Sequence, residues 1–216
     1  MPRPRSDIHP RIIEAARARF LIEGVDGSSL RTIAKDANTS IGMIYYYFPS
    51  KDDLLFAVVE DVYEGLLGDL RTALDPQLPA EERVTRLYAR IGCLSAVEFD
   101  VVRILIRELL VSSERLHRLL ERLRRGHLPL VVDLAASGQR DQVFRADLPL
   151  PVLILSLATC GAVPQLLRRV ALEHAPELAT QLPDGDALAA LMKSVVFLGV
   201  LAQPNKGEAP DREANR

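Results

Sequence analysis

The sequence predicts an all-α protein with a small helical head at its N-terminus and a larger helical body. Apolar residues make up 48% of the 216 residues, but only 5% are aromatic and tryptophan is absent. A composition dominated by leucine, valine and alanine is typical of packed helices. Apolar residues also recur at spacings of three and four, the period of a helix face. The chain is long enough to bury a proper core.

Charge and cysteine content narrow the class of protein. Residues 1–51 carry eight basic and five acidic side chains, so this segment is basic although the whole chain has a net charge of −2. Two isolated cysteines, Cys93 and Cys160, favour a reduced, cytoplasmic protein over a disulfide framework. No apolar run of about 18–20 residues lacks a charge or a proline, and no apolar leader opens the chain. We therefore expect no membrane span and no secretion signal.

The first predicted helix covers about residues 10–23. Pro10 suits the first turn of a helix, and Gly24 is expected to end it in the left-handed conformation. Its buried stripe comprises Ile12, Ile13, Ala16, Phe20 and Leu21. Residues 1–8 form a short arm with two arginines, which we interpret as a frayed terminus and not as a groove-binding arm.

Residues 28–55 read as three short helices joined by tight turns. Two apolar stripes are spaced by three and four, one of Leu30, Ile33, Ala34 and Ala37 and one of Ile41, Ile44 and Phe48. Asn38 lies between them and tolerates the left-handed conformation of a sharp turn. Suitable N-caps are Ser28 or Ser29, then Thr39 or Ser40, then Ser50 with Asp53 three residues later. Two short helices joined in this way form a helix-turn-helix, whose second helix fits the major groove of DNA.

This segment closely resembles the DNA-binding motif of the tetracycline-repressor (TetR) family of bacterial transcription regulators. The matching residues are Ser29, Ile33, Ala34, Ala37, Ser40, Gly42, Ile44, Tyr45, Tyr46, Tyr47, Phe48, Ser50, Lys51 and Leu54. Asn38 replaces a usual glycine and Thr39 a usual valine. Ile41 stands where lysine or arginine is common, which removes a possible base or phosphate contact. So many matches at fixed spacing make a specific motif, although it covers only about 50 residues.

The resemblance implies a homodimeric repressor that binds a pseudo-palindromic operator and releases it when a small, mostly apolar molecule binds. The residues expected at DNA are Arg31, Thr39, Ser40, Ile41, Gly42, Met43, Tyr45, Tyr46, Tyr47 and Lys51. Arg31 would pair with a guanine or a phosphate, and the tyrosines and Lys51 with phosphates. Tyr47 serves equally well as a packing residue of the head.

The body is expected to bring the total to about nine helices. A long helix from Lys51 to the Asp75–Pro76 pair should connect head and body, followed by helices near residues 80–96, 98–111, 113–138, 149–172 and 184–202. A kink or break is expected near Gly126 and Pro129. Gln142 stands where TetR-like chains often carry glycine. The predicted domains are residues 1–52 for DNA binding and 53–203 for ligand binding and dimerisation, with a disordered tail over 204–216.

The body offers weaker functional signals. Candidate ligand-binding residues are Arg103, Arg107, Glu108 and Cys160, although the two arginines would equally suit a solvated face. By resemblance the last two long helices pair with their symmetry mates through Leu157, Leu188, Met192, Val195, Val196 and Gly199. The four histidines are too widely spread for a metal site, and we expect no metal and no cofactor. No nucleophile elbow or phosphate-binding glycine loop occurs, so an enzyme is not expected.

Two other interpretations stay open. The chain could be a helical enzyme or a lipid-carrying bundle in which the helix-turn-helix is incidental. It could also be a DNA-binding regulator that takes no ligand. Specific, salt-sensitive binding to a short inverted repeat distinguishes the first alternative, and an empty, collapsed body would favour the second.

Overall fold

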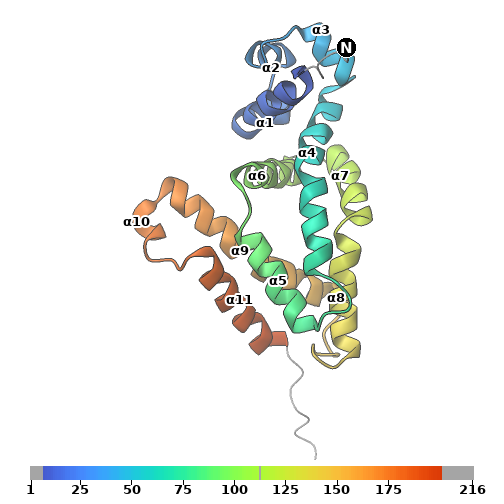
Figure 1. Cartoon of the computed structure of the whole chain (residues 1–216), viewed down its shortest axis with the longest axis vertical. Coiled ribbons are helices and arrows are strands. Elements are labelled where there is room, and N and C mark those ends of the chain that lie inside the picture. Colours follow the sequence, from blue (N-terminus) through green and yellow to red (C-terminus); the bar gives the residue numbers. More distant parts are fainter. Residues whose placement is uncertain (1–6, 112, 201–216) are drawn as a thin grey trace, which may run out of the picture. The chain divides into compact units, whose positions relative to one another are not determined.

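The computed structural model describes residues 7–111 and 113–200, and in these residues the chain forms helices and no strand (Figure 1). The prediction of an all-α fold is confirmed. The helices are α1 (Ile8–Gly27), α2 (Leu30–Asp36), α3 (Ile41–Tyr47), α4 (Lys51–Ala73), α5 (Ala80–Gly92), α6 (Ala96–Val111), α7 (Ser113–Arg125), α8 (Leu128–Arg140), α9 (Leu150–His174), α10 (Pro176–Ala179) and α11 (Gly185–Val200). The described part has eleven helices instead of nine because a break near Gly126 separates α7 from α8, and because α10 adds one short turn. Residues 1–6 of the predicted arm and the predicted tail lie outside the described residues, whereas Ile8, expected in the arm, already begins α1.

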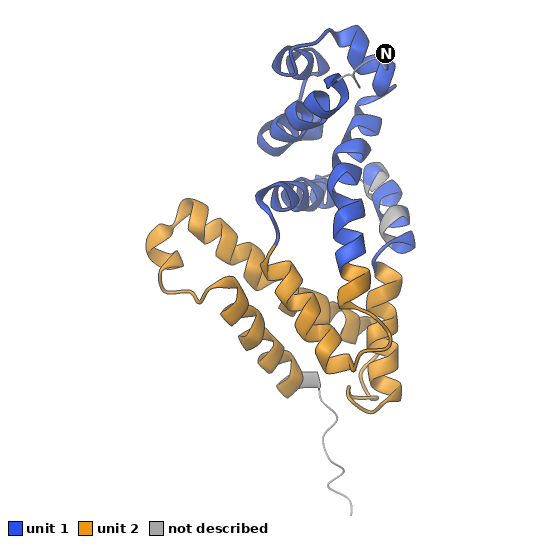
Figure 2. Cartoon of the chain, viewed as in Figure 1, with its two compact units in different colours: residues 1–69, 94–127 blue, residues 70–93, 128–216 orange. Residues whose placement is uncertain are grey.

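The chain divides into two compact units (Figure 2). The first comprises residues 1–69 and 94–127, and the second comprises residues 70–93 and 128–216. Helices α6 and α7 therefore belong to the same unit as the helix-turn-helix, whereas the sequence suggested a boundary at residue 52. The functional division at that residue stays a prediction.

The core of the first unit draws on all its helices. Its fully buried side chains include Ile12 and Phe20 of α1, Ile33 of α2, Ile44 of α3 and Leu54 of α4. Val101 and Ile104 of α6 and Leu119 of α7 belong to the same cluster. Because α6 and α7 share this core, they help to hold α1, α2 and α3 in place.

Backbone conformation at the turns follows the predictions. Gly24 has φ of 76° and interrupts α1, and Asn38 has φ of 49° between α2 and α3. Ser40 caps α3 by accepting a hydrogen bond from the Met43 amide at 3.3 Å. The cap of α2 differs, because the Ser29 side chain makes no capping hydrogen bond and the Ser28 hydroxyl instead donates back to the Gly24 carbonyl at 2.6 Å.

The second unit is built from α5, α8, α9 and α11. The Arg83 guanidinium of α5 is buried and binds the Asp133 carboxylate and the Ser137 hydroxyl of α8. The Tyr88 hydroxyl donates to the Leu157 carbonyl of α9 at 2.8 Å, and burial raises the pKa of this phenol. These polar contacts fix α5 against its neighbours. The connection from α8 to α9 contains Gln142 with φ of 59°, a backbone conformation that glycine adopts more readily than other residues.

Helix α9 carries a long apolar surface. Among the described residues it alone is long and apolar enough, by length and composition, to cross a membrane, and only 22% of its most apolar stretch is buried within the chain. The same test is passed by core helices of proteins without any membrane span, so it is weak evidence. The prediction of no span rested on interruptions such as Pro164, and these interruptions do lie within α9.

Candidate nucleic-acid interface

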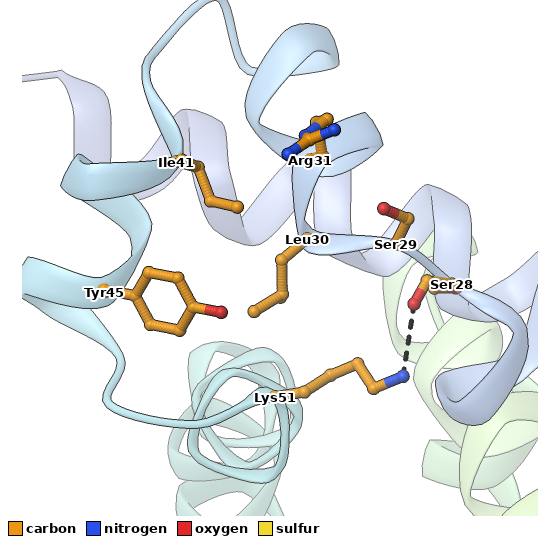
Figure 3. Close-up of a pocket in the computed structure, with 7 residues that line it drawn as sticks. All are labelled: Ser28, Ser29, Leu30, Arg31, Ile41, Tyr45 and Lys51. Carbon is orange, nitrogen blue, oxygen red and sulfur yellow. Dashed lines mark hydrogen bonds between the residues drawn. The ribbon is translucent and has the colours of Figure 1, made fainter.

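Helices α2 and α3 present one continuous surface beside the start of α4. A shallow pocket of about 380 Å³ lies there, lined by Ser28, Ser29, Leu30, Arg31, Ile41, Tyr45 and Lys51 (Figure 3). Arg31 comes from α2, Ile41 and Tyr45 come from α3, and Lys51 opens α4. The structure therefore brings together residues that the sequence predicted for DNA binding.

Helix α3 buries one face and exposes the other. Ile44 is fully buried and Phe48 nearly so, whereas the exposed fractions are 53% for Tyr45 and 77% for Tyr46. Ile41 was expected to point inward, but it is 38% exposed and lines the pocket, so that expectation is wrong. Ile41 is the first residue of α3, and the core that buries Ile44 and Phe48 does not extend far enough to cover it.

Tyr47 differs from the two exposed tyrosines. Its ring is half-buried and packs against the core of the first unit. Its centroid lies 5.4 Å from the His9 ring and 5.1 Å from the Tyr46 ring. This packing favours the structural role that the sequence left equally open.

The residues at the start of α3 have distinct surroundings. Ser40 is exposed and uses its oxygen as the helix cap, while Thr39 and Met43 are half-buried. Gly42 is exposed, and a Cβ placed there would have only the Ser40 hydroxyl within 4 Å, at 3.8 Å. Open space above Gly42 permits a close approach of DNA to the helix backbone.

Lys51 makes contacts that the sequence did not predict. Its Nζ donates to the carbonyl oxygens of Asp26 and Ser28, both at 3.1 Å. The ammonium group thereby holds the end of α1 against the start of α4. A phosphate contact by its third proton stays a prediction.

Arg115 of α7, which sequence analysis missed, anchors the head. Its Nε donates to the Glu108 carboxylate of α6 at 2.6 Å, and Nη1 and Nη2 bind both Asp26 oxygens at 2.9 and 2.7 Å. Asp52 at the start of α4 lies 3.5 Å from Nη1. We call these four residues the Arg115 cluster. The Arg115 guanidinium holds the pKa of the Asp26 carboxyl below its usual value through its hydrogen bond.

The predicted ligand-binding residues of α6 have other partners. The Arg107 guanidinium lies over Gly24 and donates to the carbonyl oxygens of Ile22 and Glu23 at 3.4 and 3.2 Å. Glu108 is buried and paired with Arg115, and the Arg103 guanidinium lies over the Phe99 ring. Arg107 thus contacts the head, because α6 packs directly on α1, and Glu108 reaches the head only through Arg115, which binds Asp26.

Cys160, the fourth predicted ligand residue, is half-buried in α9 and belongs to the second unit. A role for it stays a prediction. No group of three or more potential metal-binding side chains occurs in the part of the chain that the structure describes.

The predicted dimer residues divide into buried and exposed sets. Leu157, Leu188 and Val196 are buried inside the second unit, so their side chains are not available to a partner. Val195 is 54% exposed and Met192 is half-buried. Gly199 lies in α11, but its surroundings are outside the described part. For these three residues apolar periodicity selected the inward face, and the assignment of the dimer interface to α9 and α11 stays a prediction.

Comparisons with known proteins match this site and fold. Residues 12–58 match the sequence profile of the bacterial regulatory proteins, tetR family. The chain is 27% identical over 158 residues to the probable HTH-type transcriptional regulator YttP of Bacillus subtilis, across 72% of this chain and 76% of that protein. It is 25% identical over 142 residues to the HTH-type transcriptional repressor KstR2 of Mycolicibacterium smegmatis, across 63% of this chain and 67% of that protein.

A solved structure has a similar fold. The transcriptional regulator FadR from Bacillus subtilis, in complex with stearoyl-CoA, superimposes with a TM-score of 0.70 at 18% identity, over 88% of this chain and 98% of that one.

The DNA-binding segment of the chain, residues 12–58, is that of the tetR family of bacterial regulatory proteins. The protein is a DNA-binding regulator of transcription and not an enzyme. The interpretation of the helix-turn-helix as an incidental feature of an enzyme or lipid carrier is thereby set aside.

Proposed function

We propose that the protein is a homodimeric repressor that binds an inverted-repeat operator through α2 and α3 and releases it when an apolar effector binds. The carrying observation is the orientation of α3, which buries Ile44 and Phe48 and exposes Tyr45 and Tyr46. A helix held in this way offers its outer face to the major groove.

The dimer is supported by the exposed apolar surface of the second unit. Large apolar side chains with exposed fractions of 40% or more line α9 at Val152, Leu155, Val163, Leu167, Val170 and Leu172, and line α11 at Leu191, Val195 and Leu198. Except for Leu172, which follows Val170 by only two residues, they recur at helical spacing, so each helix presents a stripe. A contiguous apolar patch of this kind marks an interface, and a two-fold axis covers it with its own copy.

Val195→Asp tests this interface. The carboxylate would be buried without a partner in both copies, so the dimer should split and operator binding should fall by more than tenfold. Leu109→Asp is the matched control, because Leu109 of α6 is also about half exposed, at 52%, but belongs to the first unit. Sedimentation should give a folded monomer for Val195→Asp and a dimer for Leu109→Asp. A dimeric Val195→Asp protein with normal operator affinity contradicts the proposed interface.

The operator contacts are tested by selecting binding sites from random duplex DNA. The selected site should be an inverted repeat with half-sites about one helical turn, ~34–36 Å, or a multiple apart. Tyr46→Ala combined with Lys51→Ala should weaken binding to every sequence alike, because phosphate contacts do not read bases. Normal affinity of the double variant at fixed salt rules out this assignment of contacts.

The effector is proposed to be a long-chain acyl compound or a molecule of similar apolar character. The body is rich in leucine and valine and poor in aromatic residues, which suits an aliphatic ligand. FadR of Bacillus subtilis, which shares the fold, was solved with stearoyl-CoA. Helix α4 begins at Lys51 beside the recognition surface and also contributes Val62, Leu66 and Asp69 to a second pocket in the first unit. An effector that displaces α4 would therefore move the head.

A further inference from the structure

The start of α3 exposes apolar side chains where a DNA-reading helix usually carries hydrogen-bonding ones. Its sequence, IGMIYYY, contains no charged residue and no amide side chain. Ile41 is exposed at the first position, and Gly42 adds no side chain. This end of α3 therefore has little capacity to make bidentate hydrogen bonds to a base.

The surroundings of Ile41 hold its side chain at the surface. It lines the pocket together with Leu30 and Tyr45, and its side chain extends toward that of Leu30 (Figure 3). Ile44, one turn later in α3, is fully buried. Ser40, the residue before it, is occupied as the helix cap. In the first turn of α3, Ile41 is thus the exposed apolar side chain, because Gly42 has none and Met43 is half-buried.

The chemistry of the major groove defines what such a group recognises. Thymine alone among the four bases presents a methyl group there, on C5, and apolar side chains contact it. We infer that Ile41 is a specificity-determining residue that reads the C5-methyl group of one thymine in each operator half-site. Arg31 of α2 lines the same pocket and is exposed, so a neighbouring G·C pair is compatible with this arrangement.

The inference rests on the proposed binding of an inverted repeat, and its test separates the two. After an operator has been selected, each thymine is replaced in turn by deoxyuridine, which removes only the C5-methyl group. Loss of one buried methyl group should weaken wild-type binding roughly fourfold for one half-site, and about fifteenfold for both. In Ile41→Ala the effect at that position should disappear, while the effects of other thymines persist.

Two further variants make the result decisive. Ile41→Val keeps a branched apolar side chain and should retain most of the sensitivity to deoxyuridine. Ile22→Ala removes another exposed isoleucine, on α1, and should behave like the wild type. Failure to select any inverted repeat overturns the proposed function itself. An inverted repeat whose thymine methyl groups do not matter, or matter equally in Ile41→Ala, overturns only the inference about Ile41.

Discussion

Removing the Arg115 guanidinium should lower the free energy of unfolding of the first unit by more than removing a surface ion pair does. The Arg115 side chain is 11% exposed and that of Glu108 is 3% exposed. Arg115→Met leaves the Glu108 carboxylate buried without its ion-pair partner, which costs about 3–5 kcal/mol of unfolding free energy. Asp26 is two-thirds exposed, so the loss of its contact adds little.

The effect of Glu108→Gln should change sign with the background. In the wild type, Glu108→Gln removes a charge-assisted hydrogen bond to Arg115, while Arg115 still pairs with Asp26. The change should lower the free energy of unfolding by about 1.5–3 kcal/mol. In Arg115→Met it removes an unpaired buried charge, so the double variant should be at least as stable as Arg115→Met alone. The interaction is measured as a double-mutant cycle by urea unfolding.

Arg86→Met provides the matched control, because Arg86 pairs with Glu82 on the exposed face of α5. Its cost should stay below about 0.5 kcal/mol. Additive effects of Glu108→Gln and Arg115→Met, or a cost of Arg115→Met no larger than that of the control, would refute the reasoning. Operator affinity should fall together with stability in Arg115→Met, because the cluster ties α6 and α7 to the ends of α1 and α4.

Two further predictions concern the first unit. His127 Nδ1 lies 2.9 Å from the Tyr63 hydroxyl, and burial lowers the pKa of this histidine below 6.5. At a pH between the pKa of His127 in the folded protein and about 6.5, the imidazole is protonated only in the unfolded chain. The free energy of unfolding is therefore unaffected by this group above about pH 6.5 and decreases as the pH falls through that window. Urea midpoints compared at pH 7.5 and 5.5 should show a smaller fall in His127→Phe than in the wild type, and an equal fall contradicts the assignment. Gly24→Ala should lower the free energy of unfolding by about 1–2 kcal/mol, because φ at Gly24 is 76°. Gly65→Ala, in the exposed middle of α4, should raise it by about 0.5–1 kcal/mol. Thermal melts in which both variants shift in the same direction would argue against this difference.

Local stereochemistry made much of the fold predictable from the sequence. The left-handed residues Gly24 and Asn38 and the cap at Ser40 each depend on one or two neighbouring residues, so a sequence pattern suffices to identify them. The break between α7 and α8 follows in the same way from Gly126 and the nearby proline. The helix-turn-helix was recognisable because its turns and buried positions have fixed spacing.

Contacts between distant segments could not be predicted in this way. Arg115 binds Asp26, 89 residues earlier, and His127 binds Tyr63, 64 residues earlier. No spacing in the sequence connects such pairs, so sequence analysis found no partner for His127. A stripe of apolar residues also cannot show which neighbour covers it, and for that reason Leu157 and Val196 were assigned to the wrong face.

The coupling between operator and effector tests the central claim most directly. The affinity of the protein for stearoyl-CoA is measured by titration calorimetry, once on the free protein and once on the protein saturated with its selected operator. If the effector weakens operator binding a hundredfold, the operator must weaken effector binding by the same factor, ~2.7 kcal/mol. We predict this reciprocal loss. Equal affinity of the free and operator-bound protein for the effector, or no binding of any acyl compound by a protein that still binds its operator, would contradict effector-driven release and favour a regulator that takes no ligand.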